Sequence, residues 1–314
     1  MRKVINFLLK YNTIFIFALL LIVFSLSSDV FFSERNVFNL LRQVAGIGIV
    51  SMGMLLVILT AGIDLSVGSI AALASVLSAY FLLSVPLPIA IFLTVLTGVA
   101  LGSVSGFLVC NRRMAPFIVT LAMMTIARGL AYIISRGAPI LLTESGQALQ
   151  KNFGEAYFLR IPQPVILMFL IFIIVLLILK YTAFGRLVVA IGSNETAVRL
   201  SGVRVWFYKF MVYCISGGLA AIAGIISTSR TGVGSAKVGV GLELDAIAAV
   251  VIGGASLSGG KGTALNTLLG IFILGMIGNF MNLSNVPAYP QQVIKGLIII
   301  FAVLFQGIQR RSET

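Results

Sequence analysis

Apolar runs separated by short polar breaks organise nearly the whole chain. A helix needs about 20 mostly apolar residues to cross a hydrocarbon core of about 30 Å. Runs that approach this length cover approximately residues 11–28, 43–61, 66–84, 88–109, 116–135, 163–181, 208–228, 243–256, 263–283 and 291–308. The pattern predicts an all-α protein, a polytopic transmembrane helical bundle of about ten spans. The eighth run is short for a span, which suits a half-helix or part of a re-entrant element.

Composition strengthens this prediction. Of the 314 residues, 59% are hydrophobic and 10% are charged, whereas soluble domains carry about 25% charged residues. So few charges cannot cover a water-facing surface, and we expect lipid to face much of the chain. Because no Pro- or Ser-rich linker divides the sequence, we expect one domain over residues 1–314. Its longer loops cover about 136–162, expected on the outer side, and about 185–207, expected on the inner side.

The basic residues indicate the orientation in the membrane. Ten spans place both termini on one side, and that side then carries Arg2, Lys3, Lys10, Arg112, Arg113, Lys180, Arg186, Arg199, Arg204, Lys209, Lys261, Arg310 and Arg311. The opposite side carries fewer basic residues, namely Arg35, Arg42, Arg136, Lys151, Arg160, Arg230 and Lys237, together with the acids Asp29, Glu34, Glu144 and Glu155. Because Lys and Arg concentrate in cytoplasmic loops, we expect both termini in the cytoplasm and the first apolar run retained as a membrane anchor.

The residue types present in the chain argue against several classes of function. The chain has no His and only two Cys, so it lacks a metal-ligand set, and we expect no catalytic residue and no metal. Its net charge of +13 comes from basic residues scattered between apolar runs, which favours membrane topology over nucleic-acid binding. Gly260 and Lys261 match part of the phosphate-binding loop pattern, which also requires Gly at position 255 and Ser or Thr at position 262. The chain has Ala255 and Gly262 at these positions, so we expect no bound cofactor.

The break at residues 60–69 carries a charge between two long apolar runs. Its glycines can end the first helix, and Asp64 or Ser66 can cap the next one. The break is compatible with a capped turn, in which Asp64 reaches water, or with a gate in a polar pathway. Residues 254–260 resemble 62–68 in spacing, and paired Gly-interrupted segments are a pointer to a transport pathway.

Charged residues inside apolar runs are the next candidates for function. Arg128 falls slightly past the middle of its span, where it is expected to face the protein interior or to snorkel outward. Glu243 and Asp245 open the eighth run, and acids in a first helical turn are favoured by the unpaired N–H groups there. We hypothesise a buried Arg128–Asp245 ion pair, which a charge swap would test.

Two further segments suggest contacts between helices or subunits. Gly98, Gly102 and Gly106 follow one another at every fourth residue, a pattern that lets membrane helices approach closely within a subunit or across a dimer. Within the inner loop, Ser193 or Asn194 can cap a short helix over about 193–202. Its narrow apolar face favours docking of a protein over resting on lipid.

Several long motifs resemble one transporter family, the permease subunit of bacterial ABC importers for monosaccharides of the ribose, xylose, arabinose and galactose type. They are Ala61–Ser69, Pro116–Leu121 with Arg128-Gly129, Glu243–Gly254 and the inner loop Gly192–Gly202. The resemblance implies a dimer of identical or paralogous permeases in the inner membrane. It also implies a cytoplasmic ATPase that uses ATP and Mg²⁺, and a periplasmic sugar-binding protein that delivers substrate.

The resemblance also suggests roles for individual residues. The ATPase-coupling segment would include Ser193, Asn194, Glu195, Arg199 and Gly202. Independently of the resemblance, the candidates for a pathway or gate are Asp64, Ser66, Arg128, Glu243, Asp245 and Asn279. The family places Thr where Ala255 stands and usually Gly where Phe280 stands, so these departures leave the substrate open.

Other functions remain as alternatives at this point. A nucleoside or branched-chain amino acid permease of the same superfamily is one, although the intact 62–68 motif favours a sugar. A stand-alone channel or secondary carrier is another, but the chain lacks a paired carboxylate relay within the membrane and has a docking-type inner loop. A membrane enzyme has the least support, since no activated nucleophile is present.

Overall fold

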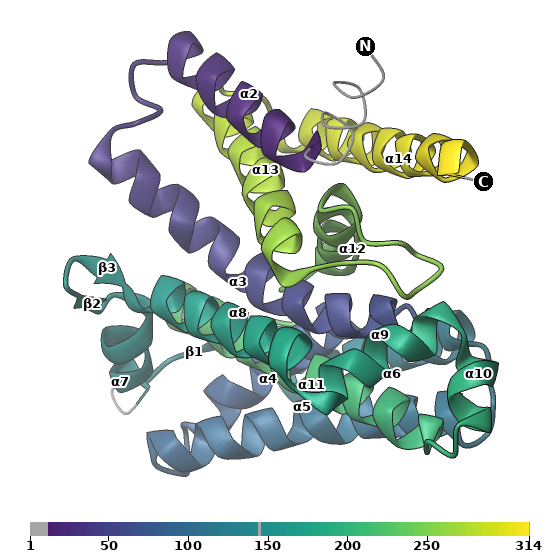
Figure 1. The fold of residues 1–314 in the computed structure, drawn as a ribbon. Helices are drawn as coiled ribbons and strands as arrows, with labels where there is room; N and C mark the ends of the chain where they lie inside the picture. The colour runs from purple at the N-terminus through teal and green to yellow at the C-terminus, as the bar shows by residue number, and fades with distance from the viewer. Residues whose placement is uncertain (1–11, 144–145, 314) are drawn as a thin grey trace.

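A bundle of helices makes up the computed structural model, which describes residues 12–143 and 146–313 (Figure 1). Arg2, Lys3, Lys10 and Glu144, which contribute to the topology prediction, lie outside the described residues. The helices are α2 (Asn12–Ser27), α3 (Glu34–Leu59), α4 (Val67–Phe81), α5 (Leu87–Cys110), α6 (Pro116–Ser135), α7 (Gln147–Leu149), α8 (Gln163–Tyr181), α9 (Ala183–Ser193), α10 (Glu195–Leu200), α11 (Val205–Thr231), α12 (Leu242–Ile252), α13 (Ala264–Leu283) and α14 (Ala288–Glu313), with a short π-helix, η1 (Gln150–Gly154).

The expectation of a polytopic membrane bundle is confirmed, although the expected count of ten spans is not established. Within the described residues, six helices are long and apolar enough to cross a membrane, namely α3, α5, α6, α8, α11 and α13. Two further apolar helices, α2 and α4, are shorter, at 16 and 15 residues. Helix α12 has 11 residues, or about 16 Å of length. It therefore has the half-helix length that the short eighth run suggested.

The predicted outer loop at 136–162 contains small elements of its own. Strand β1 (Ile140–Leu141) pairs antiparallel with β4 (Val233–Gly234), and β2 (Tyr157–Phe158) pairs antiparallel with β3 (Ile161–Pro162). The β1–β4 pair joins this loop to the segment that follows α11. The β2–β3 hairpin and α10 lie at opposite ends of the bundle in Figure 1.

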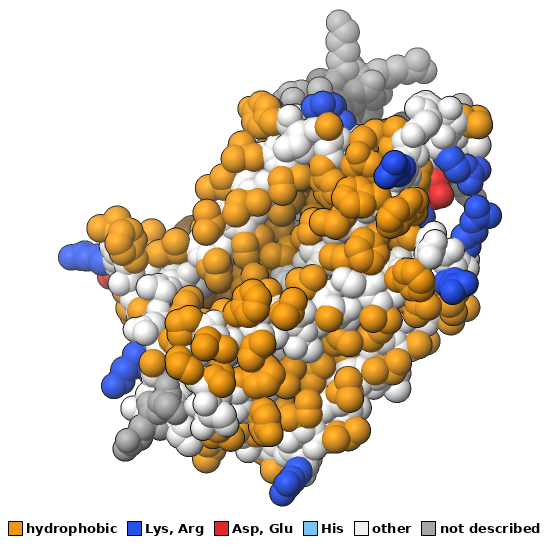
Figure 2. Space-filling model, turned by 90° about the horizontal axis from the view of Figure 1, so that it is seen from below, with side chains coloured by type: hydrophobic (Ala, Val, Ile, Leu, Met, Phe, Trp, Pro, Cys, Tyr) orange, Lys and Arg blue, Asp and Glu red, His pale blue; other side chains and the backbone are white. Residues whose placement is uncertain are grey.

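Helices α3, α4 and α11 form the centre of the bundle. Every residue of α3 from Gly48 to Leu59 is buried, and so is every residue of α4 from Val67 to Ala79. A helix that is apolar on all sides belongs inside a large protein or a membrane. The outer helices instead expose apolar side chains over broad faces, as the space-filling view shows (Figure 2). These faces are suited to contact with lipid.

Small residues bring α5 and α11 together inside the subunit. A side chain at Gly98 would collide with Ala221 and the Gly217 carbonyl, and one at Gly102 would collide with the Tyr213 carbonyl. A methyl group at Gly106 would be 3.1 Å from the Phe210 carbonyl oxygen. The glycine pattern on α5 therefore serves packing within this chain.

The inner segment at 185–207 contains more helix than the sequence predicted. Helix α9 begins after Thr182, whose hydroxyl accepts a 3.1 Å hydrogen bond from the Gly185 amide. It buries Val188 and Ile191 against the bundle. The stretch that was expected to be a loop before residue 193 is thus an amphipathic helix. Its signal in the sequence was the N-cap threonine together with apolar residues at helical spacing.

Candidate functional site

A non-helical segment enters the bundle between α11 and α12, and we refer to residues 232–241 as the re-entrant segment. Near its start, Gly234 packs against Ser75 and Ala79 of α4. Near its end, Gly239 packs against Gly68, at the first turn of α4. The segment therefore runs alongside α4 from Gly68 to Ala79, about eleven residues of that helix, or about 16 Å. Irregular backbone at membrane depth is tolerated only where protein or a water-filled cavity surrounds it.

Arg128 binds the backbone of this segment. Its Nη1 donates hydrogen bonds to the carbonyl oxygens of Ala236 at 2.6 Å and Val238 at 2.7 Å. Ser75 adds a third tie, because its hydroxyl accepts from the Ser235 amide at 3.1 Å. The guanidinium thus faces the protein interior, one of the two orientations that the sequence left open. It supplies donors to carbonyl groups that have no helix to satisfy them.

The hypothesis of an Arg128–Asp245 ion pair is wrong. Asp245 instead pairs with Lys295 of α14, with 2.8 Å between Oδ2 and Nζ. Residues two positions apart on a helix point in different directions. Glu243 accordingly lies against Gly68 of α4, while Asp245 faces α14. The signal for the true partner was Lys295 itself, a cation inside an apolar run that needed an acid nearby.

Helices α4 and α12 both begin at this place inside the bundle. A side chain at Gly68 would collide with the Glu243 carboxylate, which brings the first turn of α12 against the first turn of α4. Oε2 of Glu243 is buried and has no hydrogen-bond partner. The N-terminal ends of the two helices carry unpaired N–H groups and the positive ends of their dipoles. Polar groups and two helix ends therefore gather where most of the surroundings are apolar.

Asp64 lies in the break between α3 and α4 and is completely buried. Its Oδ1 accepts from the Ser66 amide at 3.0 Å and the Ser66 hydroxyl at 2.5 Å, and its Oδ2 accepts from the Ser216 hydroxyl at 2.8 Å. Of the two alternatives that the sequence left open, the capped turn in which Asp64 reaches water is therefore not the one observed. Ser66 is the N-cap residue of α4 but makes no side-chain capping bond, because its hydroxyl donates to Asp64.

The backbone of this break also differs in detail from the sequence prediction. The residue with positive φ after α3 is Ala61, at φ 60°, rather than a glycine. Gly62 has another role, because a methyl group there would be 2.6 Å from the hydroxyl oxygen of Tyr213. That hydroxyl is buried and has no hydrogen-bond partner. The glycine thus makes room for a buried tyrosine from α11 beside Asp64.

Asn279 of α13 is bonded to Asn36 of α3. The two amides exchange hydrogen bonds, each with 2.9 Å between donor and acceptor, and both side chains are buried. Asn36 also donates to the Phe31 carbonyl oxygen at 2.9 Å. The sequence singles out Asn279 but not Asn36, because a reciprocal pair across 243 residues leaves no local pattern. The adjacent Phe280 stacks on Phe24, with 4.3 Å between ring centroids.

The two glycine-containing breaks between apolar runs, residues 60–69 and 254–260, meet at the end of the bundle that carries α10. The Gly260 amide donates to the Leu59 carbonyl oxygen at 3.0 Å. A side chain at Gly192, near the end of α9, would collide with that same carbonyl. The 254–262 loop, the end of α3 and the end of α9 therefore form one packed unit next to α10.

Helix α10 is the short helix that the inner loop predicted. Asn194 caps it, since its Oδ1 accepts from the Ala197 amide at 2.9 Å, and Gly202 follows the helix at φ 80°. The Ser193 hydroxyl donates to the Val189 carbonyl oxygen of α9 instead. Glu195 pairs with Lys209 of α11 at 3.1 Å, and its side chain is 48% exposed. The helix is thus fixed at one point and open to contact elsewhere.

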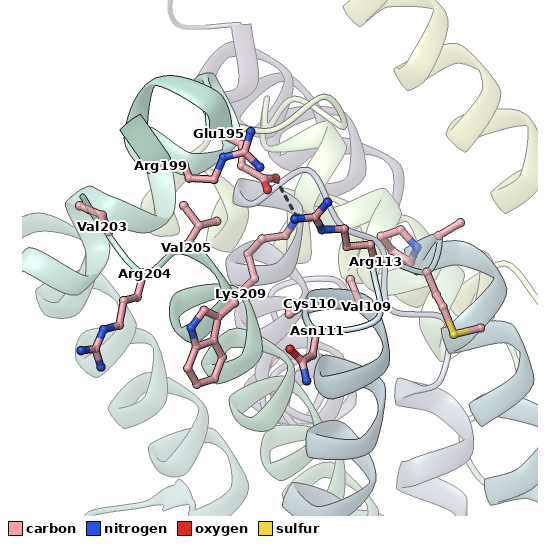
Figure 3. A pocket seen from close by; sticks show the side chains of 14 residues that line it. Val109, Cys110, Asn111, Arg113, Glu195, Arg199, Val203, Arg204, Val205 and Lys209 are labelled. Atoms are coloured by element: carbon pink, nitrogen blue, oxygen red, sulfur yellow. Dashed lines mark hydrogen bonds and ion pairs between the residues drawn. The ribbon is translucent and has the colours of Figure 1, made fainter. Parts of the chain in front are cut away.

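A pocket of about 600 Å³ lies beside α10. Figure 3 shows Arg113, Arg199 and Lys209 directing their charged ends toward Glu195, from the α5–α6 turn, α10 and α11. At the opposite end of the bundle, a second pocket of about 720 Å³ is lined by Asn39, Arg42, Gln43, Gly154, Glu155, Tyr157 and Arg230. Within the described residues, no group of three or more Cys, Asp and Glu is placed to hold a metal ion.

Relatives among known proteins cover nearly the whole of this chain. Residues 36–303 match the family described as "Branched-chain amino acid transport system / permease component". The ribose import permease protein of Bacillus subtilis is 46% identical over 287 residues, which cover 91% of this chain and 89% of that protein. The ribose import permease protein of Escherichia coli K12 is 40% identical, with 95% and 93% covered.

More distant sugar permeases are also similar. The L-arabinose ABC transporter permease protein of Azospirillum brasilense is 36% identical, over 97% of this chain and 89% of that protein. The xylose transport system permease protein of Escherichia coli K12 is 34% identical, over 94% and 90%. No solved structure matches this chain.

Proposed function

Because the chain belongs to the permease-component family that its residues 36–303 match, we propose that it is the membrane permease of an ABC importer for a monosaccharide. It is a transport subunit rather than an enzyme. The observation that carries the proposal is 40–46% identity to ribose import permeases over at least 91% of the chain.

Ribose is the substrate that we propose first. The family description names branched-chain amino acids, whereas the relatives compared above are permeases for ribose, arabinose and xylose. Identity falls from 46% for a ribose permease to 36% for an arabinose permease and 34% for a xylose permease. A pentose is thus favoured over an amino acid, and ribose is favoured among the pentoses.

The power for transport would come from a cytoplasmic ATPase that hydrolyses ATP with Mg²⁺. We propose that it docks on the segment formed by Ser193, Asn194, Glu195, Arg199 and Gly202. The capped and exposed α10 supports this role, since a rigid short helix transmits movement better than a flexible loop. The packed unit of Leu59, Gly192 and Gly260 would carry that movement to both Gly-interrupted breaks.

The pathway would pass the place where α4 and α12 begin. Asp64, Ser66, Arg128 and Glu243 lie on the elements that meet there, and broken helices near the bilayer midplane are a recurring feature of solute sites in transporters. Asp245 would position α12 through Lys295, and Asn279 would position α13 through Asn36. We therefore assign those two residues to support of the pathway rather than to solute contact.

The orientation and the other partners follow from the same proposal. With α10 in the cytoplasm, the 720 Å³ pocket at the other end of the bundle would face the periplasm. Both termini would be cytoplasmic, in agreement with the positive-inside distribution. A periplasmic sugar-binding protein would deliver the substrate at the outer face, and a second permease subunit would complete the pathway.

Reconstitution tests this function. The purified permease would be placed in proteoliposomes with the partner ATPase and the binding protein, and uptake of radiolabelled ribose, arabinose, xylose and leucine would be compared. We expect ATP-dependent uptake of ribose above that of the other solutes. Uptake that persists without the ATPase would refute the importer, and selective uptake of leucine would refute the sugar assignment.

A further inference from the structure

The 600 Å³ pocket beside α10 has an excess of positive charge. Its lining includes Arg113, Arg199, Arg204 and Lys209 but a single acid, Glu195. Lys209 is the residue that pairs with Glu195, at 3.1 Å. Within the described part of the chain, the three arginines have no carboxylate within salt-bridge distance. The pocket therefore holds a net positive charge that a bound anion would balance.

These cations come from separate parts of the chain. Arg113 lies in the turn between α5 and α6, Arg199 on α10, and Arg204 directly before α11. Figure 3 shows Arg113 and Arg199 directed toward Glu195, while Arg204 points away from it. Guanidinium groups present planar, forked donors that match phosphate oxygens. The chemistry of the pocket thus favours a phosphate group over a neutral ligand.

The rim of the same pocket is apolar and exposed. Met114 and Trp206 line it with 43% and 51% of their surface exposed. Phe117 on α6 and Phe207 on α11 follow the lining residues Pro116 and Trp206 in sequence and are also exposed, at 53% and 43%. Tryptophan concentrates where the hydrocarbon core meets the headgroups. The basic pocket is therefore set at the level of the lipid headgroups, with apolar side chains on the membrane side.

We propose that this pocket binds the headgroup phosphate of an anionic phospholipid, with the acyl chains along Met114, Phe117 and Trp206. Basic pockets between transmembrane helices bind such headgroups. A free phosphate ion would satisfy the arginines but would leave the apolar rim uncovered. Combined cationic and apolar contacts favour the lipid.

The only tryptophan of the chain is Trp206, which makes its fluorescence a direct probe of this pocket. The purified full-length permease would be titrated with brominated phosphatidylglycerol and, separately, with brominated phosphatidylcholine, because bromine quenches indole emission at close range. We expect stronger quenching by phosphatidylglycerol, and loss of this preference at high salt because the contact is electrostatic. Equal quenching by the two lipids in the wild-type protein would overturn the proposal.

Substitutions of the arginines test whether the pocket causes the preference for the anionic lipid. Each basic side chain near a membrane surface favours an anionic lipid roughly fivefold, so the double variant Arg113→Gln/Arg204→Gln should reduce the preference by at least about fivefold. Arg112→Gln is the control, since Arg112 is adjacent in sequence but lies over the Phe107 ring, outside the pocket lining. A preference that Arg112→Gln lowers as much as the double variant does would refute a specific pocket.

Two further measurements separate the lipid from other anions. Soluble glycerol phosphate should leave the quenching preference unchanged, because it lacks acyl chains. Abolition of the preference by glycerol phosphate would instead assign the pocket to a free phosphate compound. If the double variant kept the lipid preference but bound the partner ATPase more weakly, the pocket would belong to the protein interface and the lipid proposal would fail.

Discussion

The Ser216 hydroxyl donates a 2.8 Å hydrogen bond to Oδ2 of Asp64, and this bond joins the α3–α4 break to the interior of α11. Asp64 is fully buried, and its other oxygen accepts two bonds from Ser66. Burial of a carboxyl group is costly unless hydrogen bonds compensate. The three bonds therefore fix the conformation of the break in relation to the helix that packs against it.

Removing either side of this contact should destabilise the protein. Asp64→Ala leaves the Ser66 and Ser216 hydroxyls without their acceptor, which costs about 1–3 kcal/mol for each unsatisfied group. Ser216→Ala removes one bond and should cost less. Thermal unfolding in detergent measures both, with Ser201→Ala as the control, because the Ser201 hydroxyl is exposed and bonds within its own turn. A melting temperature for Ser216→Ala equal to that of the control would contradict this network.

Arg128→Gln should loosen the re-entrant segment. The substitution removes charged hydrogen bonds to the Ala236 and Val238 carbonyls, each worth about 1.5–3 kcal/mol, while the surrounding helices keep their own contacts. Hydrogen exchange of the amides in residues 232–241 should accelerate by at least about tenfold, since 1.4 kcal/mol corresponds to tenfold. Arg136→Gln, at the C-cap of the same helix, is the control. Unchanged exchange in Arg128→Gln would show that the segment is held by packing alone.

The helices were largely predictable because a bilayer demands long apolar runs, and these runs are visible in the sequence. The contacts between them were not. Asp64 appeared able to reach water because it follows the end of an apolar run, yet the chain turns inward there and buries it. Ala61 takes the left-handed conformation although a glycine follows it. In both cases distant packing decides the outcome, and local preference does not.

The charged residues show the same contrast between predictable helices and unpredictable contacts. A run of apolar residues marks Lys295 and Arg128 as unusual, but it does not say that Lys295 faces Asp245 while Arg128 faces backbone carbonyls. Glu243 and Asp245 are two positions apart, so rotation of α12 alone decides which of them meets α14. Short-range features were easier to predict. The Asn194 cap and the helix after it were identified because all of the interacting atoms lie within a few residues.

The reciprocal amide pair between Asn36 and Asn279 predicts non-additive mutational effects. Each single Asn→Leu change leaves the other amide buried without its partner, at about 1–3 kcal/mol. The double variant removes both polar groups, so its loss of stability should be smaller than the sum of the two single losses. Unfolding in detergent gives the four values of this double-mutant cycle. Additive losses would show that the two amides act independently.

The close contact between α5 and α11 predicts opposite effects for two glycine substitutions. Gly102→Ala places a methyl group against the Tyr213 carbonyl oxygen, so we expect a loss of about 1–3 kcal/mol, as for other overpacked cores. Gly129→Ala is the matched control, because no atom lies within 4 Å of the added methyl and alanine favours a helix. It should leave stability unchanged or raise it. Equal melting temperatures for the two variants would contradict the packing described here.

Charge reversal at Glu195 tests whether α10 couples the permease to its ATPase. Glu195 is 48% exposed and Lys209 is 18% exposed, so the pair contributes more than a fully exposed one, which is worth about 0–1 kcal/mol, and the thermal unfolding of Glu195→Lys is measured beside its uptake. We expect ribose uptake to fall at least about tenfold while the partner ATPase still hydrolyses ATP, because a reversed charge would face the docking surface. The swap Glu195→Lys/Lys209→Glu restores the internal pair but not the outward charge, so uptake should stay low. Recovery of uptake in the swap would mean that Glu195 acts only within this chain, and the docking role would then fall to other residues of α10.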